Sequence, residues 1–363
     1  MIVKKYGGSS LANNTKIKQV AKSISLCSDK QIVVVSAPYG MTNKLISCAN
    51  DISPTPSLRE LDQMLVTGEM LNASLLAIAL IKLGVKAISL NAYSLGIYAS
   101  SNYGNALIKM IDKRRIEDLF LEYDVIVVTG FQGINNKEFV TLGRGGSDTT
   151  ALALSAIFKT DCLIYTDVSG VYTIDPRESK RYLCLKNISF DQMLELSLSG
   201  GKVLSERAAV IAKNYLVSTK ILKSLGDDGT NIVPLEENGP KAVSVIYLSK
   251  NKKNIPFIIL NNKSYYKNNE GNLVGISIVG DFMLTDNTDK ILQNALKKTK
   301  IRAYSYVFKD NFLFVVIKRK NKSKLIDELA LRLPLKEWFS LLFKYYCIKI
   351  RYLNIKNNFN IEK

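Results

Sequence analysis

The chain has 363 residues, of which 47% are hydrophobic, so it can bury a sizeable core, and its length favours two domains. It contains no histidine, which excludes an imidazole base and a histidine-ligated metal, and its five cysteines form no CxxC pair. The formal charge is +18, yet residues 236–363 alone hold 24 Lys and Arg against 11 Asp and Glu, a net charge of +13. Because this excess lies in a Lys- and Asn-rich tail, we attribute it to compositional drift, and nucleic acid is not an expected partner.

The N-terminus predicts a strand over residues 2–6 that runs into a glycine turn, with no secretion signal before it. No run of apolar residues is expected to be long enough to cross a bilayer, so we expect a cytoplasmic protein. Lys5 precedes Gly7 and Gly8, and a lysine beside a glycine turn supplies a compact charge for phosphoryl oxygens. A solvated lysine at the end of a strand is the alternative interpretation.

The β-branched run at residues 31–37 predicts a strand buried on both faces of a parallel sheet. Ser36 and Thr42 lie at the end of this strand and in the loop after it, and a helix N-cap is the alternative for Thr42. Glu69 then lies among apolar residues of a helix, where a carboxylate is costly unless it is paired. It is therefore a candidate for binding an ammonium group, with a place on a surface helix as the alternative. An alternating β and α pattern continues with strands at 86–90 and 124–129 and a helix at 104–120.

A glycine-rich turn at residues 143–146 opens a helix, and a buried strand follows at 163–166. The glycines leave room for backbone N–H groups to converge on an anion beside the helix N-terminus. Asp148 either caps this helix or positions a cationic group, and its neighbours Ser147, Thr149 and Thr150 are expected to supply further caps. Open α/β sheets bind ligands at the loops after their strands, so we expect a nucleotide at the polar loop residues Asp167, Ser169, Tyr172, Asp175 and Arg177.

These segments resemble the aspartate kinase family, whose GRGGSDTTA motif is unaltered at residues 143–151. The family's YTDVDGVYTADPR-like motif is similar to residues 165–177, and its KYGGSS opening and GE pair match residues 5–10 and 68–69. Its KVLHPRA motif is less well matched, although Lys202 and Arg207 are kept. The departures from these motifs are Ser169, Ile174, Ser205 and Glu206.

The resemblance implies an α/β protein with two domains. Residues 1–235 would form the amino acid kinase fold, a three-layer α/β/α sandwich with a mainly parallel sheet, and residues 236–363 a reduced, small α+β ACT-like domain, clearest at 273–331. The implied activity is ATP-dependent phosphorylation of the side-chain carboxylate of L-aspartate, the first step towards lysine, threonine and methionine, by a homodimer that binds Mg²⁺ with the nucleotide. The alternatives are enzymes of the same fold that act on glutamate, acetylglutamate, carbamate or a nucleotide, and a catalytically decayed regulatory or binding subunit.

The resemblance also implies roles for individual residues. Lys5 would contact the transferring phosphate and Asp148 would orient Lys5. Arg144 would bind the α-carboxylate of L-aspartate and Glu69 its ammonium group, and the full set of residues that contact this substrate would be Ser36, Thr42, Glu69, Arg144 and Ser147. ATP would be held by Lys5, Tyr6, Gly7, Gly8, Thr166, Asp167, Tyr172, Asp175, Arg177 and Lys202.

Beyond a linker near residues 235–241, the pattern predicts a strand, a helix, two strands and a helix over residues 273–331. We interpret residues 243–260 as the remnant of a second ACT repeat and the last thirty or so residues as an amphipathic helix. Asp281 follows Gly280 where effector-binding ACT domains place a turn for the ligand's carboxylate. Because Asp281 is a poor neighbour for a carboxylate, we expect lysine and threonine to inhibit weakly or not at all.

Overall fold

The computed structural model describes residues 1–234, 242–247, 273–279, 287–309 and 312–332. Of these, residues 1–169 and 207–231 form one compact unit and the remainder form a second. This division differs from the expected domains, 1–235 and 236–363, because Ile174 packs in one hydrophobic core with the C-terminal strands and helices. The expected domain boundaries stay a prediction.

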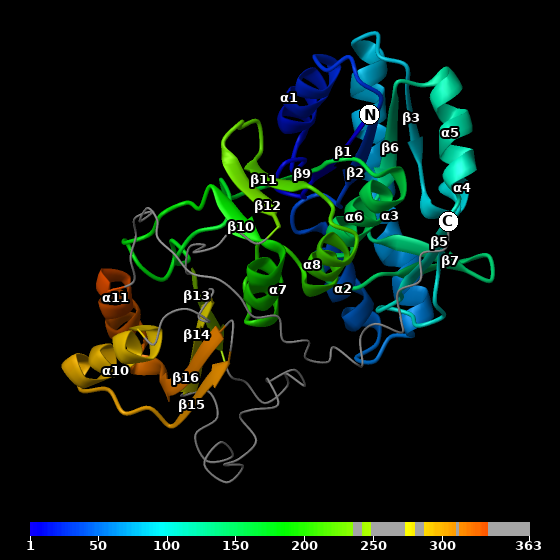
Figure 1. Cartoon of the computed structure of the whole chain (residues 1–363). Coiled ribbons are helices and arrows are strands. Elements are labelled where there is room, and N and C mark those ends of the chain that lie inside the picture. The colour runs from blue at the N-terminus through cyan, green and yellow to red at the C-terminus, as the bar shows by residue number, and fades with distance from the viewer. Residues whose placement is uncertain (235–241, 248–272, 280–286, 310–311, 333–363) are drawn as a thin grey trace. The chain divides into compact units, whose positions relative to one another are not determined.

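The first unit is built around a mainly parallel sheet whose central strands are continuous β-branched runs. β2 (Gln31–Val35) and β6 (Val125–Thr129) are buried at every position, as expected of strands covered on both faces. The order of these strands across the sheet is β12-β11-β9-β1-β2-β6-β3, as Figure 1 shows. The other strands in this order are β1 (Ile2–Tyr6), β3 (Ala87–Leu90), β9 (Cys162–Thr166), β11 (Thr219–Lys223) and β12 (Gly229–Val233).

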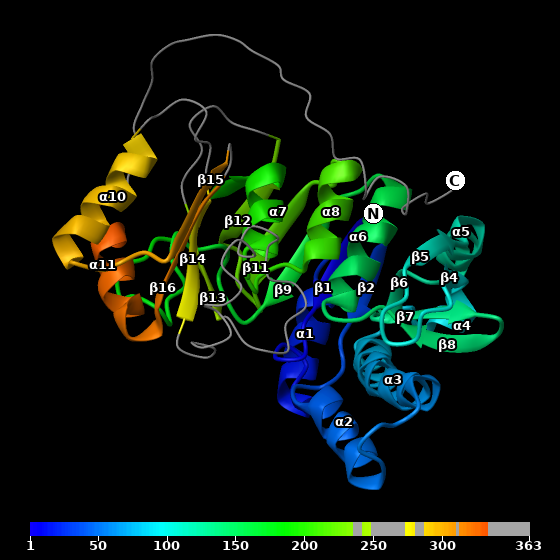
Figure 2. The ribbon, with the colours of Figure 1, turned by 90° about the horizontal axis from the view of Figure 1, so that it is seen from below.

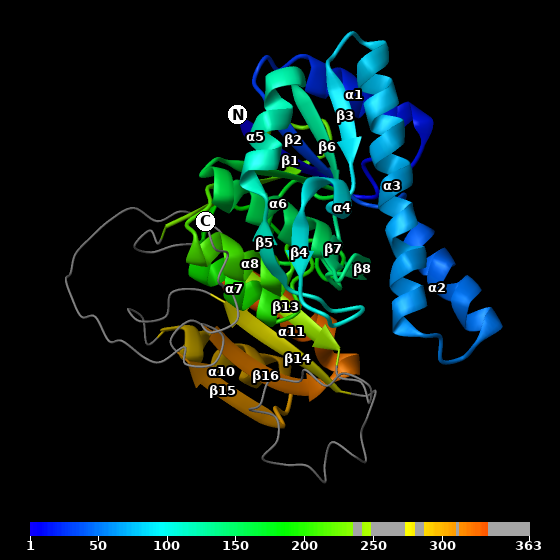
Figure 3. The ribbon, with the colours of Figure 1, turned by 90° about the vertical axis from the view of Figure 1, so that its right-hand side faces the viewer.

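Helices cover both faces of this sheet. Apolar side chains of α1 (Asn14–Ser25) and α3 (Leu58–Lys82) share one buried core with β2 and β6. The opposite face carries α5 (Lys113–Glu122), α6 (Gly146–Phe158) and α8 (Glu206–Asn214), as the views in Figures 2 and 3 show. The expected three-layer α/β/α arrangement with a mainly parallel sheet is therefore confirmed.

α3 is the longest helix among the described residues and is long and apolar enough to cross a membrane by length and composition. The expectation that no apolar run has that length was therefore wrong. Half of the apolar window is buried, and the helix carries Asp62, Glu69 and Asn72 as buried polar residues. These features identify α3 as a core helix.

The first unit also contains a smaller sheet, and one of its strands occupies part of residues 104–120, where a helix was expected. Its strand order is β5-β4-β7-β8. The expectation was wrong because residues 108–111 form a strand, and α5 begins only at Lys113, where Asp112 caps it by accepting a hydrogen bond from the Arg115 N–H at 3.1 Å. The elements of this region are α4 (Ala92–Leu95), β4 (Ile97–Ala99), β5 (Ile108–Ile111), β7 (Gln132–Asn135) and β8 (Glu138–Thr141), and α2 (Met41–Ile52) packs on α3.

The second unit contains an antiparallel sheet with the order β13-β14-β16-β15. The predicted order of strand, helix, strand, strand and helix is confirmed, and the elements are β14 (Leu273–Val279), α10 (Asn287–Thr299), β15 (Ser305–Lys309), β16 (Phe312–Lys318) and α11 (Lys322–Arg332). β13 (Ala242–Tyr247) pairs with β14, so the described part of the supposed second repeat completes this sheet. This unit also holds β10 (Asn187–Ser189) and α7 (Phe190–Leu198). The rest of the supposed repeat, the turn with Asp281 and the C-terminal helix lie outside the described residues.

Candidate functional site

The glycine turn after β1 packs closely against the turn after β2. The parallel register places Tyr6 beside Val35 and Tyr165, so β1, β2 and β9 end at the same edge of the sheet. The Gly7 N–H donates to the Tyr165 carbonyl at 3.1 Å. A Cβ on Gly8 would lie 2.5 Å from the Ala37 oxygen, so no other residue fits there without displacing the backbone. Backbone amides and a buried lysine therefore meet at this edge.

Lys5, on β1, reaches Asp148 in the first turn of α6. Its Nζ lies 2.6 Å from Asp148 Oδ1, and each side chain is only 11% exposed. A Cβ on Gly7 would lie 3.6 Å from the same Nζ, at van der Waals contact, so the glycine turn lies directly beside the ammonium group. Of the two interpretations of Asp148, the geometry matches the one in which it positions a cationic group.

The glycine turn before α6 is present as predicted, but the capping of the helix differs from the prediction. Gly143 and Gly145 have φ of 75° and 72°, which favours glycine, and Gly145 is the N-cap with no side-chain cap hydrogen bond. The expected capping role of the four residues 147–150 was therefore wrong, because they lie inside the helix. Their side chains serve elsewhere: Thr149 and Thr150 hydroxyls donate to the carbonyls four residues before them, at 3.2 and 3.0 Å, and Ser147 lies against Gly130.

Arg144 projects from this turn as an exposed residue, and within the described part of the chain it has no ion pair. A guanidinium group in that state keeps its donors available for a planar carboxylate. The structure thus leaves Arg144 accessible, while the turn around it is built from residues with positive φ.

Glu69 is a buried carboxylate with half of its hydrogen-bonding capacity unused. α3 packs closely on the β2 turn at Gly68, where a Cβ would lie 2.8 Å from that of Ala37. This contact lets Glu69 Oε1 accept the Ala37 N–H at 3.0 Å, whereas Oε2 has no hydrogen-bond partner among the described residues. The side chain is 3% exposed, and burial raises its pKa to about 7 although the Ala37 amide opposes the shift. An ammonium ligand would satisfy Oε2 and stabilise the charge.

Ser36 and Thr42 lie on the two sides of the turn after β2. The Ser36 carbonyl accepts a hydrogen bond from Asn72 Nδ2 at 2.8 Å, which ties the turn to α3 one helical turn after Glu69. Thr42 is not a helix N-cap, because α2 begins at Met41 and Gly40, with φ of 79°, is the N-cap. Its side chain is half-buried in the first turn of α2.

The residues expected to hold ATP are divided between the two compact units. Tyr6 and Thr166 belong to the first: the Tyr6 ring stacks on that of Tyr165 with centroids 4.5 Å apart, and Thr166 Oγ1 donates to Asp167 at 3.0 Å. In the second unit, Arg177 Nη2 lies 2.8 Å from Asp175 Oδ2. The expected ATP residues of the second unit are Tyr172, Asp175, Arg177 and Lys202.

Charge and hydrogen bonds organise the segment around Asp175 within the second unit. Partial burial opposes ionisation of Asp175, but the guanidinium and amide of Arg177, together with the charge of Lys202, hold its pKa below the usual range. The segment is anchored to α11, where Ser179 Oγ donates to Asp327 at 2.8 Å and Lys322 pairs with Glu178. Tyr172 meets Tyr182 edge to face, with centroids 5.3 Å apart.

Sequence reasoning missed Asn72 and Asp62, which share α3 with Glu69. Asn72 follows Glu69 by three residues and Asp62 precedes it by seven, both spacings that return to the same side of an α-helix. Buried polar residues at that spacing were the available signal.

Comparison with known proteins finds a family and a fold. The family model described as "Amino acid kinase family" matches residues 1–223. An aspartate kinase of Stutzerimonas stutzeri is 44% identical over 242 residues, covering 65% of this chain and 59% of the relative, and aspartokinase 2 of Bacillus subtilis is 42% identical over 245 residues, covering 66% and 60%. The chain therefore spans about three fifths of the length of these relatives.

Two solved structures are similar over most of the chain. Escherichia coli aspartokinase III in complex with aspartate and ADP has a TM-score of 0.73 at 19% identity, covering 92% of this chain and 99% of that one. Aspartate kinase from Synechocystis has a TM-score of 0.58 at 28% identity, covering 91% of this chain and 69% of that one.

Proposed function

The chain belongs to the amino acid kinase family, and we propose that it is an aspartate kinase, which transfers the γ-phosphoryl group of ATP to the side-chain carboxylate of L-aspartate. The products are 4-phospho-L-aspartate and ADP. The relatives that carry this name support the proposal, as does the unaltered GRGGSDTTA motif.

The observation that carries the proposal is the buried pair of Lys5 and Asp148 beside Gly7. In phosphoryl transfer the protein mainly positions the reactants and neutralises the charge on the transferred group. Lys5, held by Asp148, would offer its ammonium to that group beside the Gly7 turn. The substrate carboxylate is ionised at neutral pH, so no general base is needed, in keeping with a chain that has no histidine.

Recognition of L-aspartate would use its two charged ends. Glu69 Oε2 would accept a hydrogen bond from the α-ammonium group, and Arg144 would bind the α-carboxylate through two parallel hydrogen bonds. With those ends fixed, only a side chain of the right length brings its carboxylate to the transferred phosphate. Ser36, Thr42 and Ser147 would add hydrogen bonds.

ATP would bind with Mg²⁺, and the donor set fits a metal that arrives on the nucleotide phosphates. Among the described residues no group of three acidic or cysteine side chains gathers to hold a metal alone. Lys5 with the Gly7 and Gly8 turn would face the phosphates. The other proposed nucleotide contacts are Tyr6, Thr166, Asp167, Tyr172, Asp175, Arg177 and Lys202.

The cellular setting is part of the same proposal. As in the family that the sequence resembles, the enzyme would work in the cytoplasm as a homodimer and begin the pathway to lysine, threonine and methionine. The second unit, with its ACT-like order of strands and helices, would contribute to dimer contacts.

A hydroxylamine trap tests the proposed activity. The purified chain with ATP, Mg²⁺ and L-aspartate should form an acyl phosphate, detected as the hydroxamate, while L-glutamate should give little, because its carboxylate lies one methylene further from the anchored ends. Equal turnover of both acids would overturn the assignment to aspartate. No product from either acid would favour a catalytically decayed subunit.

A further inference from the structure

Asp62 is a buried carboxylate that holds two separate segments of the first unit. It is 1% exposed. Its Oδ2 accepts hydrogen bonds from the N–H of Gly104 at 2.9 Å and from the N–H of Thr141 at 2.8 Å, and Oδ1 accepts one from the Thr141 hydroxyl at 2.6 Å. Hydrogen bonds to an ionised carboxylate are among the stronger ones in proteins. Asp62 therefore fixes the end of β8 and the loop at 103–107 to α3.

Arg207, at the start of α8, holds the same two segments. Its Nη1 donates to the carbonyls of Leu142 at 2.8 Å and Ala106 at 3.0 Å, and its Nη2 donates to Asn105 Oδ1 at 2.5 Å. The planar guanidinium reaches three acceptors at once, which a lysine cannot do. One anion and one cation, far apart in sequence, thus bind the same two segments, residues 104–106 and 141–142.

These contacts hold the backbone of Thr141 and Leu142, just before Arg144, on both the N–H and the carbonyl side. The N–H of Thr141 is held by Asp62 and its carbonyl by the Ala106 N–H at 2.9 Å. The N–H of Leu142 donates to the Phe131 carbonyl at 2.8 Å, and its own carbonyl is held by Arg207. Gly143 then lies so close to the loop that a Cβ would be 3.0 Å from Asn105 Oδ1. Thr141 and Leu142, which precede Gly143 and Arg144, thus have every backbone N–H and C=O group hydrogen-bonded.

We propose that Asp62 and Arg207 are positioning residues that set the place of the Arg144 backbone relative to Glu69, so that one amino acid meets both side chains. This inference rests on the proposed function. Asp62 and Glu69 lie on one helix, about 10 Å apart along its axis. Glu69 is a residue of α3. Asp62, on the same helix, binds the end of β8, which leads to Arg144. An error of about 1 Å between two substrate anchors can cost orders of magnitude in rate.

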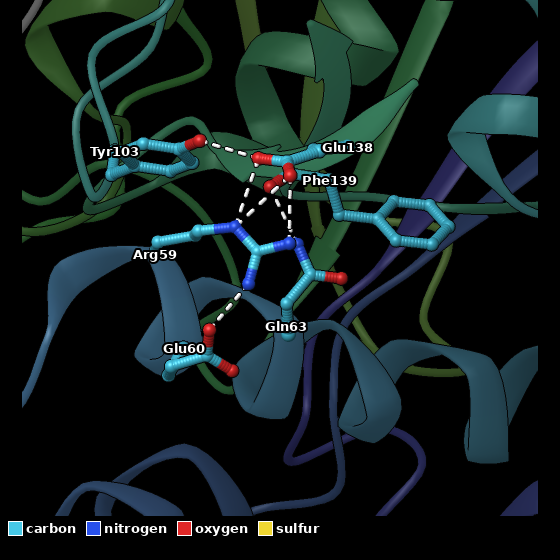
Figure 4. Close-up of polar contacts among 6 residues, drawn as sticks. All are labelled: Arg59, Glu60, Gln63, Tyr103, Glu138 and Phe139. Carbon is cyan, nitrogen blue, oxygen red and sulfur yellow. Dashed lines mark hydrogen bonds and ion pairs between the residues drawn. The ribbon is translucent and has the colours of Figure 1, made fainter. Parts of the chain in front are cut away.

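A second set of contacts joins the same elements at the surface and supplies a control (Figure 4). Arg59, on the first turn of α3, donates from Nη2 to Glu138 of β8 at 2.7 Å, and the Tyr103 hydroxyl donates to Glu138 at 2.6 Å. The Arg59 and Glu138 side chains are 45% and 33% exposed. Solvent-exposed ion pairs contribute little, so Arg59→Gln should leave the kinetics unchanged within about twofold.

A double-mutant cycle tests the positioning role. Asp62→Asn keeps the shape of the side chain but removes its charge and leaves a single acceptor oxygen, so the two backbone N–H groups and the Thr141 hydroxyl can no longer all keep their acceptors. We expect it to raise the KM for aspartate about tenfold, with kcat and the KM for ATP within about threefold of the parent. In an Arg144→Ala background the same change should add less than about twofold, because the residue it positions is gone.

The outcomes separate this inference from the proposed function. No hydroxamate from the parent chain would contradict the function. An active parent in which Asp62→Asn and Arg144→Ala act additively on KM, or in which Asp62→Asn lowers only kcat, would overturn the positioning role. If Asp62→Asn does not fold, Arg207→Lys replaces it in the cycle, since it keeps the charge and loses the three-acceptor contact. Its failure to raise KM would overturn the proposal equally.

Discussion

Each of the two units contains an ion pair, and the two ion pairs are built in different ways. Lys5 and Asp148 come from a strand and a helix far apart in the sequence, lie 2.6 Å apart and are each 11% exposed. Arg177 and Asp175 are two residues apart in one loop, lie 2.8 Å apart and are 69% and 36% exposed. Burial strengthens an interaction with a ligand and makes loss of one partner costly, whereas water screens the exposed pair. The proposed catalytic charge is thus fixed by the fold, and the proposed nucleotide contact is only local.

The largest expected effect is that of Lys5→Ala. If Lys5 stabilises the transferred phosphoryl group, its loss should lower kcat about 100-fold or more and change the KM for aspartate little, because charge spreads over that group mainly in the transition state. Steady-state kinetics by the hydroxamate assay measures both constants. A kcat within a few-fold of the parent would show that the role given to Lys5 is wrong.

Stability has to be separated from catalysis in that variant, because Asp148 would be left buried without its cation. Loss of one partner of a buried pair costs about 3–5 kcal/mol. The double variant Lys5→Ala with Asp148→Ala should recover much of the thermal stability but none of the activity. Lys18→Ala, an exposed lysine on α1, is the matched control and should behave as the parent.

Glu69 provides an effect of intermediate size that depends on pH. Burial raises its pKa to about 7, and only the ionised form attracts the ammonium group of the substrate. The kcat/KM for aspartate should therefore rise about tenfold between pH 6 and pH 8, as the ionised fraction grows. A flat profile over this range would remove Glu69 from the binding step.

The same carboxylate should destabilise the ligand-free protein at high pH. Because its folded-state pKa lies above the unfolded value, the folded state holds the proton more tightly, and stability falls as pH rises from about 4.5 through 7. Glu69→Gln should then be more stable than the parent at pH 8, by up to about 3 kcal/mol, and similar to it near pH 4. Denaturant unfolding at the two pH values measures the difference. If Glu69→Gln and the parent were equally stable at both pH values, the Glu69 carboxylate would have to be stabilised by a partner that the structure does not identify.

The parts of the fold that sequence predicted are those where local pattern and final environment agree. The run at β2 is β-branched throughout and ends buried on both faces. The region of β5 was mistaken for helix because Ile108 and Ile111 satisfy a helical spacing of three as well as the strand that they form. Turn chemistry caused the errors about helix caps: at Gly40 and Gly145 a glycine with positive φ is the N-cap, so the polar residues after it do not cap the helix.

In the candidate site, too, the residues could be predicted from local sequence, whereas their contacts depend on tertiary structure. The family resemblance implied that Asp148 orients Lys5, and the structure supplies the physical reason: the parallel register of β1 with β9 and the packing of α6 on the sheet bring the two side chains together. Spacing could mark Asp62 as a buried polar residue but could not give its role, because two of its three partners are the backbone N–H groups of Gly104 and Thr141, which any sequence supplies. Such contacts depend on tertiary structure alone.

The smallest expected effect is that of Arg177→Ala. This variant tests the exposed member of the two ion pairs compared above. If Arg177 contacts the nucleotide, its removal should raise the KM for ATP by no more than about tenfold at low salt, and leave kcat and the KM for aspartate unchanged. Because water and ions screen an exposed charge, the difference from the parent should shrink towards about twofold at 0.5 M salt. Lys18→Ala should show no salt-dependent change in the KM for ATP. A salt-insensitive loss in kcat as large as that of Lys5→Ala would contradict this. It would mean that Arg177 becomes buried against the bound nucleotide, so that the Arg177–Asp175 pair is no longer more exposed than the Lys5–Asp148 pair.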